Sequence, residues 1–504
     1  MPAIRPFHAV FAAIIGSIAL ASGCASDSPT ESTWEKARSG ANNSATRIHA
    51  IESIWKEAKS GRGSLDEARR LAVDLVWDRG VNPGARFRAA EIMLDDRRPE
   101  ALAHTRSVMR LMLPTEPSRS IVALFAKEAG ENGWSDLTDA LVRRLAIDDA
   151  ELPLRQRIES VAIMDLNPTK SLEEAVFAQF LTPDEPDLIE PNIGWRERVR
   201  SAAWNVLARI DPSGERRNVM LTRPMPAEAD AETQTLVEDV RAAMNELSAS
   251  PTTSMEFDWL RSVRDGSDEN AAWWSVAASA IDTVSPLNRR GLAMRHIEPI
   301  RWVAENRTAW LGASRDELLD ELAKRLDRHE HHTRTAELDV TRRRSRERLT
   351  DWRDVMSWGD AIAALVAEEA VHTEAFAHSI WAQVQRDRDD TTTEYGGMVA
   401  IANDGFYRPV LFVPRQRDRV SDNRFVASSD LLAASDRALA HYHMQVQRKW
   451  STPFAGPSGG DLQYAETSGR TAFVFTTVGS DEINVDYYQP DGVVIDLGVI
   501  SRPG

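Results

Sequence analysis

Hydrophobic positions recur at helical spacing over most of the chain. From about residue 45, apolar residues such as Ile48, Ile51, Ile54 and Trp55 return every three or four positions, which is the period of an amphipathic α-helix. Segments of the same kind follow at residues 84–94, 97–112, 117–130, 136–146, 152–163, 169–181 and 193–209, separated by proline and glycine. The pattern predicts an all-α region over residues 45–326.

Three of these helical segments look alike: GARFRAAEIML, PLRQRIESVAIM and GWRERVRSAAWNVLARI. Each has a turn residue and an arginine near its start, and then places small and aliphatic residues on one face. Short paired helices of this type predict an α-solenoid of HEAT-like character. Because the spacing of the segments is irregular, a helical domain without repeats remains the alternative.

A charged stretch follows and predicts a helical connector over residues 327–364. His329-Glu330-His331-His332 does not match the HExxH zinc motif, since its first and last histidines are three positions apart, and it is interpreted as a solvated helix face. Five arginines lie among acidic residues, which favours an ion-paired helix over a polyanion site; they are Arg342, Arg343, Arg344, Arg346 and Arg348.

The period changes from helix to strand at Glu394. YGGMVAIA and YRPVLFV flank Asn403-Asp404-Gly405-Phe406, which is a hairpin signal. Alternating or apolar runs continue in ALAHYHMQVQ and at residues 471–478, 483–489 and 492–499. Short helices are expected within residues 431–440 and 461–467. Together with the apolar helix that precedes Glu394, this predicts a small α+β domain over residues 365–504.

Composition narrows the class of protein. A length of 504 residues predicts two or three domains, and 42% hydrophobic with 27% charged residues is typical of a soluble globular protein. The net charge of −16 argues against general nucleic-acid binding, because an acidic chain repels phosphate. The single cysteine, Cys24, excludes a disulfide within the chain and a zinc site built from several cysteines.

The N-terminus holds a short apolar segment that ends at the single cysteine. Residues 1–23 contain Arg5, an apolar run from about Val10 to Ala21 and small residues before Cys24, and the apolar run is short for a bilayer span. This pattern resembles a bacterial lipoprotein signal. The resemblance implies cleavage before Cys24 and lipid attachment to its thiol, which places the protein in the cell envelope, outside the cytoplasm. Ala25 follows Cys24, so an outer-membrane location is expected where two membranes are present. An ordinary secretory signal is the alternative. Residues 24–44 are expected to form a flexible tether.

Candidate chemistry gathers in the C-terminal region. His441 and His443 are two apart in a predicted strand and therefore face the same side. Imidazole nitrogen and carboxylate oxygen are ligands that zinc accepts, so Asp461, after a Gly459-Gly460 turn, is a candidate third ligand. Glu394 is a candidate proton acceptor, and Ser458 could donate a hydrogen bond to an oxyanion. Ser458-x-x-Asp461 is also an ordinary helix-capping pattern.

The order Glu394, His441-x-His443, Ser458-x-x-Asp461 resembles the JAB/MPN zinc metalloprotease family, over about residues 365–500. The resemblance implies that His441, His443 and Asp461 bind zinc, that Glu394 is the general base, and that Ser458 helps to stabilise the tetrahedral intermediate. Two features depart from the family. Met444 stands where proline is usual after the second histidine, and the seventeen residues 444–460 make a longer gap, with an insertion expected over residues 447–453.

The sequence therefore predicts a lipid-anchored zinc metallopeptidase that hydrolyses a peptide or isopeptide bond in a peptide or protein substrate. The membrane would be reached through the lipid on Cys24. The alternative is a non-catalytic lipoprotein scaffold that binds proteins through its helical region. The oligomeric state is left open.

Overall fold

The computed structural model describes residues 32–147, 152–183, 194–336, 346–419, 421, 424–446 and 451–504. Cys24 and the expected signal segment lie outside these residues. The chain divides into two compact units, one up to Leu102 and one from Ala103 to Gly504, with the border inside α5. Within the described residues, no helix combines the length and the apolar character that a membrane crossing needs.

The first unit is helical. Its elements are α1 (Thr33–Arg38), α2 (Ser44–Lys59), α3 (Leu65–Trp77), α4 (Pro83–Asp95) and the start of α5 (Pro99–Met112). The expected tether over residues 24–44 is wrong at its C-terminal side, because residues 33–38 form α1. Ser32 and Glu35 cap this helix reciprocally, and the buried Arg47 donates from Nε to the Ala37 carbonyl at 3.2 Å. These polar bonds order a segment that has little apolar surface of its own.

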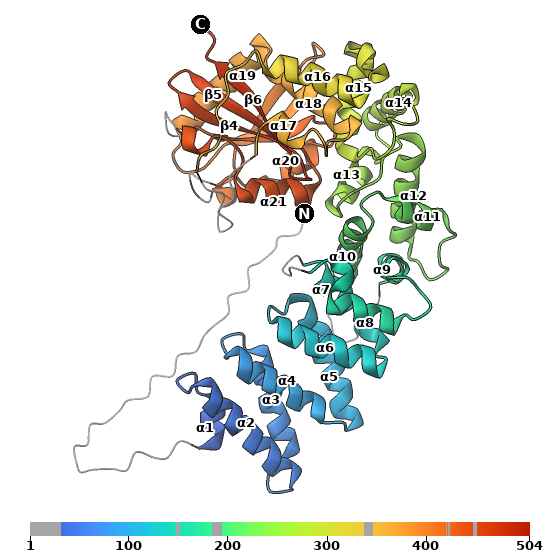
Figure 1. Ribbon diagram of the computed structural model, residues 1–504, viewed down its shortest axis with the longest axis vertical. Helices are drawn as coiled ribbons and strands as arrows, with labels where there is room; N and C mark the ends of the chain where they lie inside the picture. Colours follow the sequence, from blue (N-terminus) through green and yellow to red (C-terminus); the bar gives the residue numbers. More distant parts are fainter. Residues whose placement is uncertain are drawn as a thin grey trace, which may run out of the picture. The chain divides into compact units, whose positions relative to one another are not determined.

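The second unit begins with a long run of helices, which confirms the all-α prediction for the middle of the chain (Figure 1). They are α6 (Arg119–Asn132), α7 (Thr138–Leu145), α8 (Ile158–Leu166), α9 (Leu172–Leu181), α10 (Trp195–Ile210), α11 (Glu215–Thr222), α12 (Ala231–Glu246), α13 (Met255–Val263), α14 (Asp268–Thr283), α15 (Ile297–Asn306) and α16 (Arg315–Leu326). Neighbouring helices pack in pairs, such as α9 with α10. The HEAT-like character of the pairs stays a prediction.

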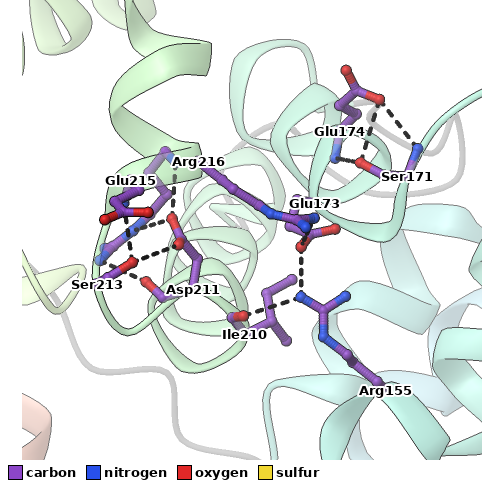
Figure 2. A network of polar contacts seen from close by, with 10 residues as sticks. Arg155, Ser171, Glu173, Glu174, Ile210, Asp211, Ser213, Glu215 and Arg216 are labelled. Carbon is purple, nitrogen blue, oxygen red and sulfur yellow. Dashed lines mark hydrogen bonds and ion pairs between the residues drawn. The ribbon is translucent and has the colours of Figure 1, made fainter.

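Ion pairs to a buried carboxylate join some of these helices, in addition to apolar packing. Figure 2 shows Arg155 and Arg216 converging on Glu173, each at 2.5 Å. Arg155 also donates to the Ile210 carbonyl at 3.2 Å. Because the Glu173 side chain is almost fully buried, removal of either cation would leave a desolvated carboxylate with less compensation.

The expected helical connector over residues 327–364 is only partly helical. Residues 327–336 form turns and extended backbone, α17 (Leu349–Trp352) is a single turn, and α18 (Trp358–Val371) begins within the predicted range. The extended part forms hydrogen bonds with β6 (Val494–Ser501) of the sheet. His332 N donates to Asp496 Oδ2 at 3.1 Å, and Val499 N donates to the Glu330 carbonyl at 2.9 Å. Arg342, Arg343 and Arg344 lie outside the described residues.

The C-terminal part is a mixed six-stranded sheet with helices, so the α+β prediction is confirmed at this level. Its strands follow the order β2-β1-β3-β4-β5-β6. The β1–β2 hairpin turns at Asn403–Gly405 as predicted, and β3 and β4 are the parallel pair. The strands are β1 (Gly396–Ile401), β2 (Tyr407–Phe412), β3 (Ala440–Gln445), β4 (Ala472–Gly479), β5 (Glu482–Tyr488) and β6 (Val494–Ser501).

Helices cover both faces of the sheet. On one side, α18 and α19 (Glu374–Arg388) contact the sheet, and Phe376 of α19 meets Phe475 of β4. On the other side, Ala465 of α21 (Gly459–Ser468) packs in one cluster with Ala472 and Val474. A short helix, α20 (Ser429–Ala434), precedes β3. The alternation along β4 therefore assigns one face to α19 and the other to α21.

The last helices of the helical run pack directly on this α+β part. Trp259 Nε1 in α13 donates to the Asp436 carbonyl just before β3. The buried Glu256, also in α13, lies against Gly469 at the end of α21. Tyr407 in β2 donates to Glu298 Oε1 at 3.3 Å. The predicted end of the helical region at residue 326 is thus crossed by contacts of α13 and α15 with the α+β part.

Candidate metal-binding site

The two histidines of the motif lie on the central strand β3 and face α21. In the parallel register, His441 pairs with Ala472 and His443 with Val474, and both partners belong to the cluster around α21. The residue between them, Tyr442, faces the opposite side and donates to Gln383 of α19. The predicted strand and the shared face of the two imidazoles are therefore confirmed.

Asp461 reaches the same face from the start of α21. Ser458 is the N-cap of this helix: its Oγ accepts from Asp461 N at 3.3 Å, while Ser458 N donates to Asp461 Oδ2 at 2.7 Å. The capping pattern seen in the sequence is thus real, and it fixes the carboxylate. Since Oδ2 is held by the cap, Oδ1 is the oxygen that meets His443, at 3.5 Å from Nε2.

All five predicted site residues line one open pocket of about 1200 Å³. They are Glu394, His441, His443, Ser458 and Asp461. Glu394 precedes β1 and is 7% exposed, and the neighbouring backbone pairs with β3, since Met444 N donates to the Tyr395 carbonyl at 2.9 Å. The structure therefore brings all five predicted residues to one cavity, although they come from three separate stretches of the chain.

His441 is the most deeply buried of the five. Its Nδ1 lies 2.7 Å from the Tyr464 hydroxyl, and its buried Nε2 has no hydrogen-bond partner among the described residues. Burial, together with the positive charge of Arg470, lowers the pKa of His441 well below its ordinary value, so this imidazole is neutral at neutral pH. Burial raises the pKa of Tyr464 to about 12, and the phenol is therefore also neutral.

The three predicted ligands are not fully gathered. Among the described His, Cys, Asp and Glu residues, the only set of three whose ligand atoms all lie within 4.8 Å of one another is His329, Glu368 and His372. His443 and Asp461 have the separation that two ligands of one tetrahedral zinc ion show, roughly 3.4 Å. The ligand atoms of all three residues do not lie within 4.8 Å of one another, so binding of one ion by all three requires them to come closer together.

Phe425 forms a wall of the pocket and packs on His443, with ring centroids 6.0 Å apart and planes 11° from parallel. Gly396, opposite His443 in the β1–β3 register, makes room for it. A Cβ atom on Gly396 would lie 2.6 Å from Phe425 Cε2 and would also collide with the Tyr442 carbonyl. The first of the two glycines after Glu394 is therefore required by close packing beside the histidine.

The His329–Glu368–His372 cluster is close enough for a metal but has the wrong orientation. The two imidazoles stack with centroids 3.7 Å apart and planes 6° from parallel. A metal ion lies near the plane of each imidazole that binds it, so one ion cannot serve two stacked rings. Glu368 is already engaged, with Oε1 3.1 Å from His329 Nε2 and Oε2 3.0 Å from Arg325. The cluster pins residues 327–336 to α18, which corrects the interpretation of His329 to His332 as a solvated helix face.

The expected insertion is held at its C-terminal end. Residues 447–450 lie outside the described residues, but Pro453 accepts hydrogen bonds from Thr335 N at 3.1 Å and Ala336 N at 2.7 Å. Arg334 donates to the carbonyls of Phe454 and Gly456, at 3.2 and 3.0 Å. The extended connector therefore fastens the chain that leads into Ser458 and Asp461.

Sequence reasoning missed Tyr464, Phe425 and Arg334 as parts of the pocket wall. Tyr464 carried a usable signal, because it lies three residues after Asp461 on a predicted helix and so shares its face. Phe425 and Arg334 lie in irregular segments, where no periodicity assigns a direction to a side chain.

Comparison with protein-family models finds no match for this chain, and comparisons with curated proteins and with solved structures likewise find none. The functional conclusion therefore rests on the residues and geometry of the pocket.

Proposed function

We propose that the protein is a zinc-dependent peptidase of the JAB/MPN type, attached to the cell envelope by a lipid on Cys24. The observation that carries the proposal is the convergence of Glu394, His441, His443, Ser458 and Asp461 on one pocket. These residues come from three separate stretches of the chain, and their presence in one pocket is what the motif predicts if it describes one site.

The donor set suits zinc. Two neutral imidazoles and one carboxylate are a common protein ligand set for catalytic zinc, which keeps a further position for water or substrate. The buried Nε2 of His441, which has no hydrogen-bond partner in the described part of the chain, is explained if a metal ion binds there, since buried polar atoms are otherwise satisfied. A zinc ion held by these residues would supply Lewis acidity and make a bound water acidic near neutral pH.

The remaining residues of the pocket can carry the proton transfers of amide hydrolysis. Glu394 accepts the proton of water as the water oxygen bonds to the substrate carbonyl carbon, and it returns that proton to the amide nitrogen as the carbon–nitrogen bond breaks. Ser458 Oγ accepts from Asp461 N, so its hydroxyl hydrogen remains available to donate to the developing oxyanion.

The size of the pocket favours a polypeptide substrate. An open cavity of about 1200 Å³ exceeds the roughly 300–1,000 Å³ that small-molecule sites occupy. Phe425, Phe454 and Tyr464 line it and offer apolar contacts to side chains of an extended segment. With a lipid on Cys24, the substrates would be peptides or exported proteins at the cell envelope.

The metal content of the purified full chain tests the proposal. After dialysis against zinc, mass spectrometry should find about one zinc per wild-type chain and none above background in the His441→Ala/His443→Ala variant. His378→Ala is the matched control, because this histidine is exposed on α19 and should leave the zinc content unchanged. A wild-type chain that holds no zinc would refute the proposed function.

Lipid attachment is tested separately. Cells fed a labelled fatty acid should incorporate it into the wild-type protein and not into a Cys24→Ala variant. Equal labelling of both proteins, or labelling of neither, would contradict the anchor without affecting the peptidase proposal.

A further inference from the structure

The hydrogen bond between Tyr464 and His441 has a consequence for the protonation of the imidazole. A neutral histidine carries one proton, on either Nδ1 or Nε2. With the proton on Nε2, Nδ1 would accept from the phenol at 2.7 Å, and the buried Nε2–H would find no partner within the described ranges of the chain. With the proton on Nδ1, this nitrogen donates to the phenol oxygen, and Nε2 is left as a bare lone pair.

The second arrangement is the one that a metal ligand needs. Histidines that bind metals usually donate from the other ring nitrogen to a neighbouring acceptor, which fixes both the tautomer and the ring orientation. The only hydrogen bond of the His441 side chain to a described residue is the one to Tyr464. Tyr464 lines the open pocket, so its own hydroxyl hydrogen can be donated to water in that pocket.

The position of Tyr464 in the fold suits this role. It lies on α21, three residues after Asp461, and the same helix therefore presents one predicted ligand and the partner of another. Ala465, the next residue, is buried against Ala472 and Val474, which anchors this turn of α21 to β4. The phenol is thus held beside the β3 histidines by packing that does not involve the pocket.

We propose that Tyr464 is a positioning residue of the zinc site, which accepts the Nδ1 proton of His441 and so leaves Nε2 to bind the metal. This inference rests on the proposed zinc site. No other role in the reaction is assigned to Tyr464.

The first test measures the tautomer and needs no metal. In the full chain with ¹⁵N-labelled histidine and zinc removed, long-range ¹H–¹⁵N spectra should place the His441 proton on Nδ1, with the resonance assigned by its absence in His441→Ala. The Tyr464→Phe variant should shift the population towards Nε2–H. A wild-type His441 protonated on Nε2 would overturn the inference, and this measurement stands even if Tyr464→Phe fails to fold.

The second test measures zinc affinity by competition with a chromophoric chelator. Tyr464→Phe should bind zinc about 10- to 100-fold more weakly than wild type, the range found when such supporting partners of metal ligands are removed. Tyr442→Phe is the control: it removes a buried phenol hydrogen bond from the same strand, but on the opposite face, and should change the affinity less than about 2-fold, well below that range.

The outcomes separate the two proposals. If the wild-type chain binds no zinc, the proposed function fails, whatever the tautomer. If wild type binds zinc and Tyr464→Phe binds it equally tightly, the zinc site stands and the role of Tyr464 is refuted. If Tyr442→Phe weakens binding as much as Tyr464→Phe, the effect is one of general stability, and the role is likewise refuted.

Discussion

Two histidine clusters in the second unit differ in a way that separates packing from chemistry. His329, Glu368 and His372 are the closer set, yet their rings are stacked and their carboxylate is shared with Arg325. His441, His443 and Asp461 are less tightly gathered, but they line an open pocket, and Nε2 of His441 has no hydrogen-bond partner among the residues that the structure describes. Proximity of ligand atoms is therefore a weaker criterion than a buried ring nitrogen left without a hydrogen-bond partner beside an open pocket.

The largest expected effect concerns the general base. Glu394→Gln should retain zinc and lose hydrolysis by about 10²- to 10⁴-fold, because the amide cannot accept the water proton. The assay compares peptides released by cells that carry wild type or the variant, and then the rate on the peptide identified. Glu374→Gln, at the exposed start of α19, is the control. A Glu394→Gln enzyme with the wild-type rate would show that another group takes the proton.

The second effect is stabilisation by the metal. A ligand that binds only the folded state at 1,000 times its dissociation constant adds about 4 kcal/mol to the free energy of unfolding. Zinc should therefore raise the denaturant midpoint of wild type and leave His441→Ala/His443→Ala unchanged. The opposite result would contradict the assignment of zinc to the pocket. In that result, His329→Ala/His372→Ala abolishes the stabilisation by zinc, and His441→Ala/His443→Ala keeps it.

A smaller loss of stability is expected when the His329–Glu368–His372 cluster is changed. Glu368→Gln should lower the free energy of unfolding by about 1–3 kcal/mol, because the partly buried guanidinium of Arg325 and imidazole of His329 lose a charged acceptor. Zinc content and the rate per folded molecule should stay at wild-type values. Denaturant unfolding measures the free energy of unfolding. The control is Glu330→Gln, which should leave that free energy almost unchanged because the Glu330 side chain is exposed. A loss of zinc in Glu368→Gln would assign this cluster a metal after all.

The smallest effect is a pH dependence at the connector. The hydrogen bond from His331 to Asp496, at 3.2 Å, raises the pKa of His331 against the opposing effect of burial. A raised pKa in the folded state means that this stabilisation is complete below pH 6.5 and is lost as the pH rises through the folded-state pKa. The imidazole is about one-third exposed, so solvent screening keeps the contribution below about 1 kcal/mol.

The measurement for this last effect is the free energy of unfolding between pH 5.5 and 8.5. Wild type should lose slightly more stability than His331→Gln as the pH rises. Parallel curves for the two proteins would contradict a stabilising His331–Asp496 pair.

The sequence predicted those features that local periodicity controls. The hairpin at Asn403–Gly405, the strand that carries His441 and His443, and the helix that starts after Ser458 all appear close to the expected positions. The predicted solvated helix around His329 is wrong, because a charged sequence has the same pattern whether its backbone is helical or hydrogen-bonded to a distant strand. Its hydrogen bonds to Asp496 and Val499 span more than 160 residues and leave no local pattern.

The orientation of the side chains within the site also cannot be predicted from the local sequence pattern. Nothing near His441 in sequence indicates that Tyr464 meets Nδ1, because the contact depends on how α21 crosses the sheet between β3 and β4. The role of Gly396 is similar: the requirement for glycine comes from Phe425, which enters from an irregular segment after β2.

The contacts of α13 decide where the chain can be cut. Trp259 holds the carbonyl of Asp436 before β3, and the Arg470 guanidinium stacks on the Trp259 ring at 4.4 Å while pairing with Asp436 at 2.5 Å. A fragment that starts at residue 365 would lack Trp259. It would therefore expose Asp436 and Arg470 and lose packing next to His441. The shortest fragment expected to fold with an intact pocket therefore begins upstream of Met255, well before the sheet starts.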